Sequence, residues 1–353
     1  MDVIVEGSLE VPMGNLSTFV INAPIGILPV LGFLAALQYL DSFKLLRLRF
    51  ILRMIATGGM LAIAAYHLNG EILSRLEVEF LTYARYVAPG IEETLIASAL
   101  IFLLITRRIG FLVDAAIVGF AIGAGFAVVE NFVYLMNTDA NTGIWIVRGF
   151  GTAIMHGGVT AIFGIITMGM LEKHEKLSIT YLLPGFILAT IIHSVFNHFF
   201  FSPIFSTMAV FVLLPPFMYL IFERSTASLH DWLELDFDAD ADLIAQLNSG
   251  EFQDTHVGEY LRELRSRFEG MIIVDMLCYL RVYTELSMRA KGAMMMRQHG
   301  LEMPHDPTVE ASFQEMRYLE SSIGKTGLLA IDPFLEISRR DLWHLNSLES
   351  NHG

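Results

Sequence analysis

The sequence contains little cysteine and little charge, and each shortage excludes a class of protein. Its 353 residues include a single cysteine, Cys278, which excludes an internal disulfide and a metal site built from several cysteines. Charged residues make up 17% of the chain, against about 25% in soluble domains. The net charge of −14 disfavours a nucleic-acid-binding protein. Because 54% of the residues are hydrophobic, the composition indicates a membrane protein with several spans.

The charges are distributed unevenly along the chain. Residues 1–223 carry 15 acidic and 11 basic side chains, whereas residues 224–353 carry 22 acidic and 12 basic ones. The long apolar runs all end near Phe222. We therefore predict a membrane domain at 1–223 and an acidic, mostly helical domain at 224–353. Apolar stripes in the second domain predict packing within it, on a cytoplasmic partner, or in a homodimer.

Seven segments have the length and apolar character of membrane-spanning helices. They are residues 16–40, 50–69, 80–105, 109–136, 144–171, 179–200 and 204–222. The predicted fold is thus all-α, a polytopic transmembrane bundle in contact with the lipid bilayer. Pro89 is one of several prolines that predict kinks inside these helices. Gly119 and Gly123 form a small-xxx-small pair that favours close helix packing.

Basic residues between the spans predict the topology. Four basic residues lie between the first two spans or near the start of the second: Lys44, Arg47, Arg49 and Arg53. Positively charged loops stay in the cytoplasm. The N-terminus is then outside. Seven spans place the C-terminal domain in the cytoplasm.

Several ionisable or polar residues lie inside the predicted spans, where they are costly and usually functional. Four successive spans carry Glu92 and Glu93, then Glu130, then Arg148 and His156, then His193 and Asn197. His193 and Asn197 are four residues apart and share a helix face, as do Glu130 and Tyr134. These faces predict a wet cavity between the helices, in the middle-to-outer part of the membrane.

The residue types in this set suit hydrolysis. A carboxylate in an apolar pocket can act as a general base on water. His and Asn side chains can donate hydrogen bonds to a tetrahedral oxyanion. The same set also fits a proton or ion path, or hydrogen bonds that only hold the bundle together. The adjacent pair Glu92 and Glu93 favours catalysis.

The order of these motifs resembles a known family. The chain resembles the PrsW family of glutamic-type intramembrane proteases in the order of four motifs. These are Glu-Glu in one span, Gly-Phe-Ala-x-x-Glu-Asn-x-x-Tyr in the next, then His, then His-x-x-x-Asn. More distantly, residues 80–200 are similar to the type II CAAX prenyl endopeptidases. The PrsW pattern often continues as Glu-Glu-x-x-Lys, whereas Ile96 occupies the last position here.

The resemblance implies an endopeptidase of the bacterial cytoplasmic membrane that needs no cofactor. It implies that the substrate is a single-span membrane protein such as an anti-sigma factor, and that cleavage starts a signalling cascade. It also implies a role for each catalytic candidate: Glu92 and Glu93 activate water, Glu130 takes the place of a histidine of the CAAX proteases, His193 and Asn197 steady the oxyanion, and His156 matches a recurrent histidine of PrsW-like chains.

Two alternatives remain open at this point. One is a catalytically silent membrane sensor or scaffold that signals through the C-terminal domain. The other is a metal-dependent protease with Glu92, Glu130, His156 and His193 as ligands, since carboxylate and imidazole suit zinc. The sequence contains no H-E-x-x-H motif. Alternating acids at 236–242 lack the Gly and Glu of a calcium loop, so we interpret them as a solvated turn.

Overall fold

The computed structural model describes residues 16–41, 46–136, 142–171, 178–200, 202–248, 255–298, 301 and 306–335, and its regular elements there are all helices. The predicted all-α fold is confirmed. The chain divides into two compact units, residues 1–225 and 226–353. That these units are a protease domain and a separate cytoplasmic domain remains a prediction.

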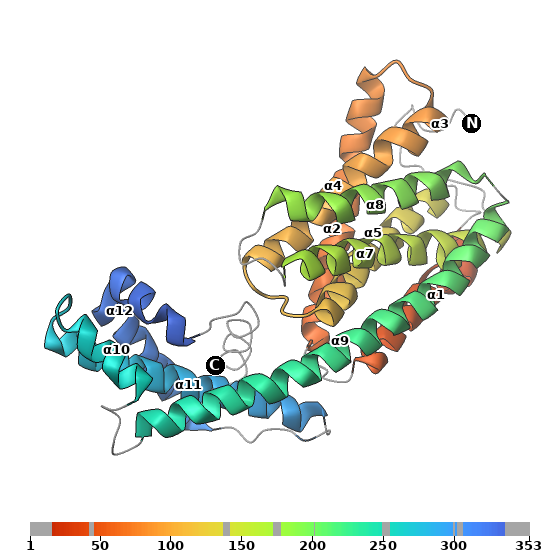
Figure 1. The fold of residues 1–353 in the computed structure, drawn as a ribbon. Helices are drawn as coiled ribbons and strands as arrows, with labels where there is room; N and C mark the ends of the chain where they lie inside the picture. The colour runs from red at the N-terminus through yellow and green to blue at the C-terminus, as the bar shows by residue number, and fades with distance from the viewer. Residues whose placement is uncertain are drawn as a thin grey trace. The chain divides into compact units, whose positions relative to one another are not determined.

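The first unit contains the predicted membrane helices (Figure 1). Their bounds are α1 Leu16–Leu40, α2 Leu48–Arg75, α3 Phe80–Thr82, η1 Tyr83–Val87, α4 Ala88–Ile105, α5 Leu112–Met136, α6 Thr142–Ile146, η2 Val147–Thr152, α7 Ala153–Leu171, α8 Ile179–His198 and α9 Pro203–Asn248. Within the described residues, seven helical segments are long and apolar enough to cross a membrane. Which end of the chain lies outside remains a prediction, and Lys44 lies outside the described residues.

Helices α5 and α7 form the centre of the bundle. Most of their residues are buried, whereas most of those of α1, α8 and the apolar part of α9 are not. Apart from a few polar residues such as Glu130 and His156, both central helices are apolar all round, which is the pattern of a helix surrounded by other helices. The surrounding helices expose large apolar side chains such as Leu28, Met60, Phe102, Ile187 and Leu213. Such surfaces suit lipid and not water.

Glycines allow the central helices to approach closely. A Cβ at Gly119 would lie 2.7 Å from the Thr160 carbonyl oxygen, and one at Gly123 would lie 2.7 Å from the His156 carbonyl carbon. Helices α5 and α7 therefore touch backbone to backbone along this crossing. On the opposite side, Gly58 of α2 and Gly125 of α5 make a second crossing of the same kind. These contacts fix the position of the α7 turn that carries His156.

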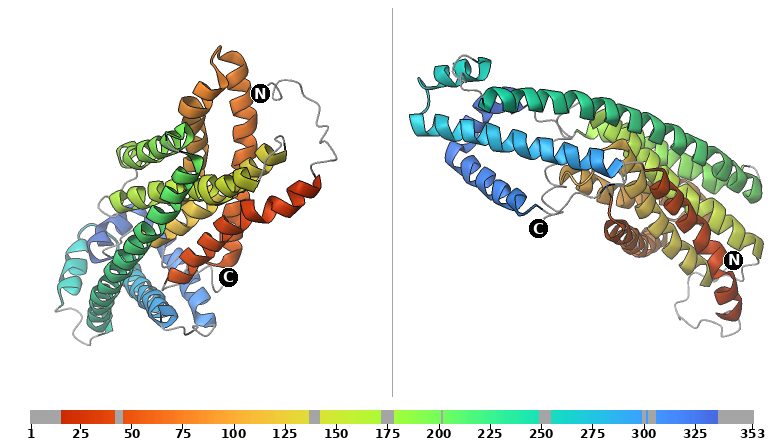
Figure 2. Two further views of the ribbon diagram at one scale, coloured as in Figure 1. Left: turned by 90° about the vertical axis from the view of Figure 1, so that its right-hand side faces the viewer. Right: turned by 90° about the horizontal axis from the view of Figure 1, so that it is seen from below.

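The second unit is a small helical bundle with its own apolar core. It contains the end of α9 and the helices α10 His256–Leu264, α11 Gly270–Gln298 and α12 Pro307–Leu335, and α11 packs along α12 (Figure 2). The interpretation of 236–242 as a turn is wrong, because these residues continue helix α9. Asp240 instead accepts a 2.7 Å hydrogen bond from Lys291, which is buried, so this acid serves as the counter-ion of a buried cation.

Candidate active site

The structure brings five of the predicted site residues into one cluster. Glu92 and Glu93 come from α4, Glu130 from α5, His156 from α7 and His193 from α8. Nδ1 of His193 lies 2.9 Å from Glu93 Oε1, and its Nε2 lies 3.6 Å from Glu92 Oε2. Nε2 of His156 lies 3.0 Å from Glu130 Oε2. The two imidazole rings meet edge to face, with centroids 4.6 Å apart.

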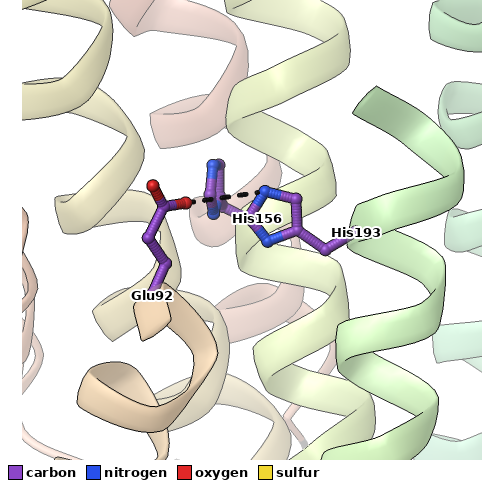
Figure 3. Close-up of side chains that lie close together, drawn as sticks. All are labelled: Glu92, His156 and His193. Atoms are coloured by element: carbon purple, nitrogen blue, oxygen red, sulfur yellow. Dashed lines mark ion pairs between the residues drawn. The ribbon is translucent and has the colours of Figure 1, made fainter. Parts of the chain in front are cut away.

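Glu92, His156 and His193 point toward a common centre (Figure 3). One potential ligand atom from each of them lies within 4.8 Å of the other two. Both histidines are 1% exposed, and the Glu92 side chain is 13% exposed. Two imidazoles and one carboxylate are the donor set of many catalytic zinc sites.

The two histidines are each oriented by a further carboxylate. Glu93 Oε1 faces Nδ1 of His193, which favours a proton on that nitrogen and leaves Nε2 facing Glu92. Glu130 Oε2 lies 3.0 Å from Nε2 of His156, close enough for its charge to favour a proton on that nitrogen. Carboxylates that hold the outer N–H of a histidine in this way are typical of metal-ligating histidines.

Glu130 is itself held by a cation. Arg148 Nη2 lies 2.9 Å from Glu130 Oε1, and the guanidinium carbon lies 4.3 Å from the centroid of the Tyr134 ring. The amide of Asn131 donates to the Arg148 carbonyl oxygen at 3.0 Å. Glu130 thus contacts an arginine with one oxygen and an imidazole with the other. Its position depends on both.

Two observations show that the cluster fits a divalent cation. Among the residues that the structure describes, the buried Nδ1 of His156 has no hydrogen-bond partner, and a buried polar atom without a partner is costly. The contacting side chains comprise three carboxylates and one guanidinium, which leaves a formal charge of −2 when the imidazoles are neutral. A divalent ion would neutralise that charge within the membrane.

Asn197 lies outside this cluster in the structure. Asn197 helps to join α8 to the π-helical turn η1. Pro89 has no N–H, so it cannot donate a hydrogen bond to a carbonyl oxygen of that turn. The Ala84 carbonyl oxygen accepts instead from Asn197 Nδ2 at 3.0 Å, and the Arg85 carbonyl oxygen accepts from Ser194 Oγ at 2.6 Å. These bonds lock α8, which carries His193, against the segment that leads into Glu92. The oxyanion role predicted for Asn197 stays a prediction.

Sequence reasoning missed Asn69, which contacts the cluster, and Tyr83, which contacts Asn69. Asn69 Nδ2 donates to Glu92 Oε1 at 3.0 Å, and Tyr83 Oη donates to Asn69 Oδ1 at 2.9 Å. Asn69 ends the predicted second span and Tyr83 lies near the start of the third. A polar residue at the end of an apolar segment ordinarily marks the membrane boundary, so no sequence pattern indicates a contact with Glu92.

A comparison with protein families matches residues 46–221 to the PrsW family, described as intramembrane metalloproteases. The chain belongs to the PrsW family. The predicted resemblance is therefore confirmed, and the matched region contains every residue of the cluster. Comparisons with curated proteins and with solved structures gave no match.

Membership of this family, together with the seven apolar helices, makes the chain a multi-pass membrane protein of an intramembrane protease family. The family description names a metalloprotease, whereas the sequence resemblance favoured a glutamic mechanism without a cofactor. The buried triad of Glu92, His156 and His193 bears directly on that difference.

Proposed function

We propose that this PrsW-family chain is a metal-dependent intramembrane endopeptidase. Glu92, Nδ1 of His156 and Nε2 of His193 would hold one divalent cation, and zinc suits this donor set. The observation that carries the proposal is Nδ1 of His156, which has no hydrogen-bond partner among the described residues and is buried beside a second imidazole and a carboxylate. When bound, such an ion supplies Lewis acidity that polarises a peptide carbonyl and lowers the pKa of water.

The remaining residues hold protons and orient the ligands. Glu93 keeps a proton on Nδ1 of His193, and Glu130 keeps one on Nε2 of His156. Each imidazole therefore presents its lone pair to the centre of the cluster. Arg148 holds Glu130 in place and offsets its charge. Together these residues keep a charged centre in order inside an apolar bundle.

A substrate would reach the cluster past Glu130. The Glu130 side chain is 33% exposed, whereas the His156 and His193 side chains are at most 2% exposed. Tyr134, one turn further along α5, is 43% exposed. We propose that the substrate is a single-span membrane protein, such as an anti-sigma factor, and that its chain enters along this end of α5.

A metal-independent mechanism is the competing hypothesis. In it Glu92 and Glu93 activate water, and His193 with Asn197 steadies the oxyanion. Asn197 would then have to release the Ala84 carbonyl oxygen, to which it donates in this structure. The metal-dependent proposal requires no such change.

We further propose that the enzyme acts in the bacterial cytoplasmic membrane with its C-terminal domain in the cytoplasm.

The experiment compares cells that produce the wild-type chain with cells that produce Glu92→Gln or His193→Gln. His67→Gln is the matched control, because His67 is exposed on α2. New N-termini of membrane proteins are identified by mass spectrometry, with the variants at equal abundance in the membrane. We expect fragments of at least one membrane protein with the wild type and the control only. Identical fragment sets in all four strains contradict the proposal.

The cleaved protein then serves as substrate for the purified enzyme. Treatment with a chelator should abolish cleavage, and added Zn²⁺ should restore it. Cleavage that persists after complete metal removal contradicts metal dependence and supports the glutamate mechanism.

A further inference from the structure

Glu92 differs from the two histidines in the kind of partner that orients it. Its Oε1 accepts a hydrogen bond from the Asn69 amide at 3.0 Å, and Asn69 Oδ1 accepts one from the Tyr83 hydroxyl at 2.9 Å. The three residues come from α2, η1 and α4. Tyr83 is 2% exposed, so its hydroxyl is held within the bundle. These two bonds form a chain that runs from Tyr83 through Asn69 to Glu92.

The direction of the two bonds depends on the charge of Glu92. An ionised carboxylate can only accept hydrogen bonds, so Asn69 must present its NH₂ group to Glu92. Its carbonyl oxygen then faces Tyr83, whose hydroxyl must donate. The chain is therefore compatible with the ionised form of Glu92, which is the form that ligates a metal.

The same chain separates the tasks of the two Glu92 oxygens. Oε1 is engaged by Asn69, whereas Oε2 lies 3.6 Å from Nε2 of His193. A glutamate side chain has several rotatable bonds, and ordering it in one rotamer is costly. A hydrogen bond to one oxygen fixes the other oxygen toward the imidazoles.

We infer that Asn69, itself held by Tyr83, is a positioning residue that presents Glu92 Oε2 as a ligand. The inference rests on the proposed metal site. With it, each of the three ligands has an outer partner: Asn69 for Glu92, Glu93 for His193 and Glu130 for His156. Outer partners of this kind typically contribute about 10- to 100-fold to metal affinity.

The test measures metal binding and does not depend on a substrate. Full-length protein in detergent is stripped of metal and titrated with Co²⁺, whose visible absorption reports the ligand geometry. Competition with Zn²⁺ then gives the zinc affinity. The variants are Asn69→Leu, which removes the amide at similar size, and Tyr83→Phe, which removes only a hydroxyl. Tyr66→Phe is the matched control, because Tyr66 is 55% exposed on the same helix as Asn69.

We expect Asn69→Leu to weaken Zn²⁺ binding by about 10- to 100-fold and to change the Co²⁺ spectrum. Tyr83→Phe should weaken binding by about 2- to 10-fold, the effect of one lost hydrogen bond. Tyr66→Phe should bind as the wild type does. Because Tyr83→Phe preserves shape, it provides the answer if Asn69→Leu fails to fold.

Two adverse results have different meanings. Folded Asn69→Leu and Tyr83→Phe proteins with wild-type affinity and spectrum overturn the positioning role alone. Wild-type protein that binds neither Co²⁺ nor Zn²⁺ contradicts the proposed metal site, and the positioning role with it.

Discussion

Substituting Gly123 by alanine should push α5 away from α7 at the turn that carries His156. The added Cβ would lie 2.7 Å from the His156 carbonyl carbon, and ordinary contact begins at 3.4 Å, so the helices must separate by at least about 0.7 Å. The obstacle is backbone, and no side-chain rotation can relieve it. Overpacking of this kind costs about 1–3 kcal/mol, against a gain of up to about 1 kcal/mol in helix propensity. With the full gain in helix propensity, the net expected loss of stability is about 0–2 kcal/mol.

The same displacement moves a metal ligand. A shift approaching 1 Å at a catalytic residue can cost about 100-fold in rate, so we expect Gly123→Ala to lose about 10- to 100-fold in cleavage and to bind Zn²⁺ more weakly. Stability is measured by unfolding in detergent, and affinity by zinc competition. Gly32→Ala is the control, because its Cβ would meet nothing within 4 Å. If Gly123→Ala matches this control in stability and in zinc affinity, the α5–α7 crossing does not position His156 as described.

Three further predictions concern contacts around the site and in the second unit. Replacing Ser194 by Ala and Asn197 by Leu together removes a side-chain donor from each of two carbonyl oxygens, so unfolding in detergent should show a loss of about 1–3 kcal/mol; an unchanged stability would mean that these bonds do not join α8 to η1. Arg148→Met leaves the Glu130 carboxylate without its cation, and we expect a loss of about 2 kcal/mol in the free energy of unfolding. This is below the roughly 3–5 kcal/mol of a fully buried pair, because the Glu130 side chain is one-third exposed. Zinc affinity, measured on the same protein, should fall as well. Burial and two nearby carboxylates raise the pKa of the Cys278 thiol, so less of the reactive thiolate is present at a given pH. Alkylation of Cys278 by iodoacetamide should therefore increase at a higher pH in the folded protein than in the SDS-unfolded chain. Coincident pH profiles would refute this.

The membrane helices were predictable because length and apolar character are properties of the chain alone. The predicted first span at 16–40 coincides with α1, and the third, at 80–105, coincides with the run from α3 to α4. The last predicted span ends at Phe222, but the helix continues to Asn248. Hydropathy locates the end of an apolar run, and a helix can extend past it into a polar segment.

The shared face of His193 and Asn197 was predictable, but the partners of these residues were not. A π turn adds a residue, and each residue rotates a helix by about 100°. The turns η1 and η2 precede Glu92 and His156, so the faces of these two residues cannot be extrapolated from the start of their spans. Pro89 marks one of these irregularities in the sequence. The contact from Asn69 to Glu92 depends on that rotation, and only the structure reveals it.

The central claim is that the buried cluster holds a divalent cation. The most direct measurement is the metal content of the purified full-length protein, determined by mass spectrometry after equilibration with Zn²⁺ and removal of unbound metal. We expect about one zinc ion per wild-type chain and per His67→Gln control chain, and a loss of that ion in His156→Gln and in His193→Gln. Wild-type protein that cleaves a substrate while it holds far less than one metal ion per chain would contradict the account.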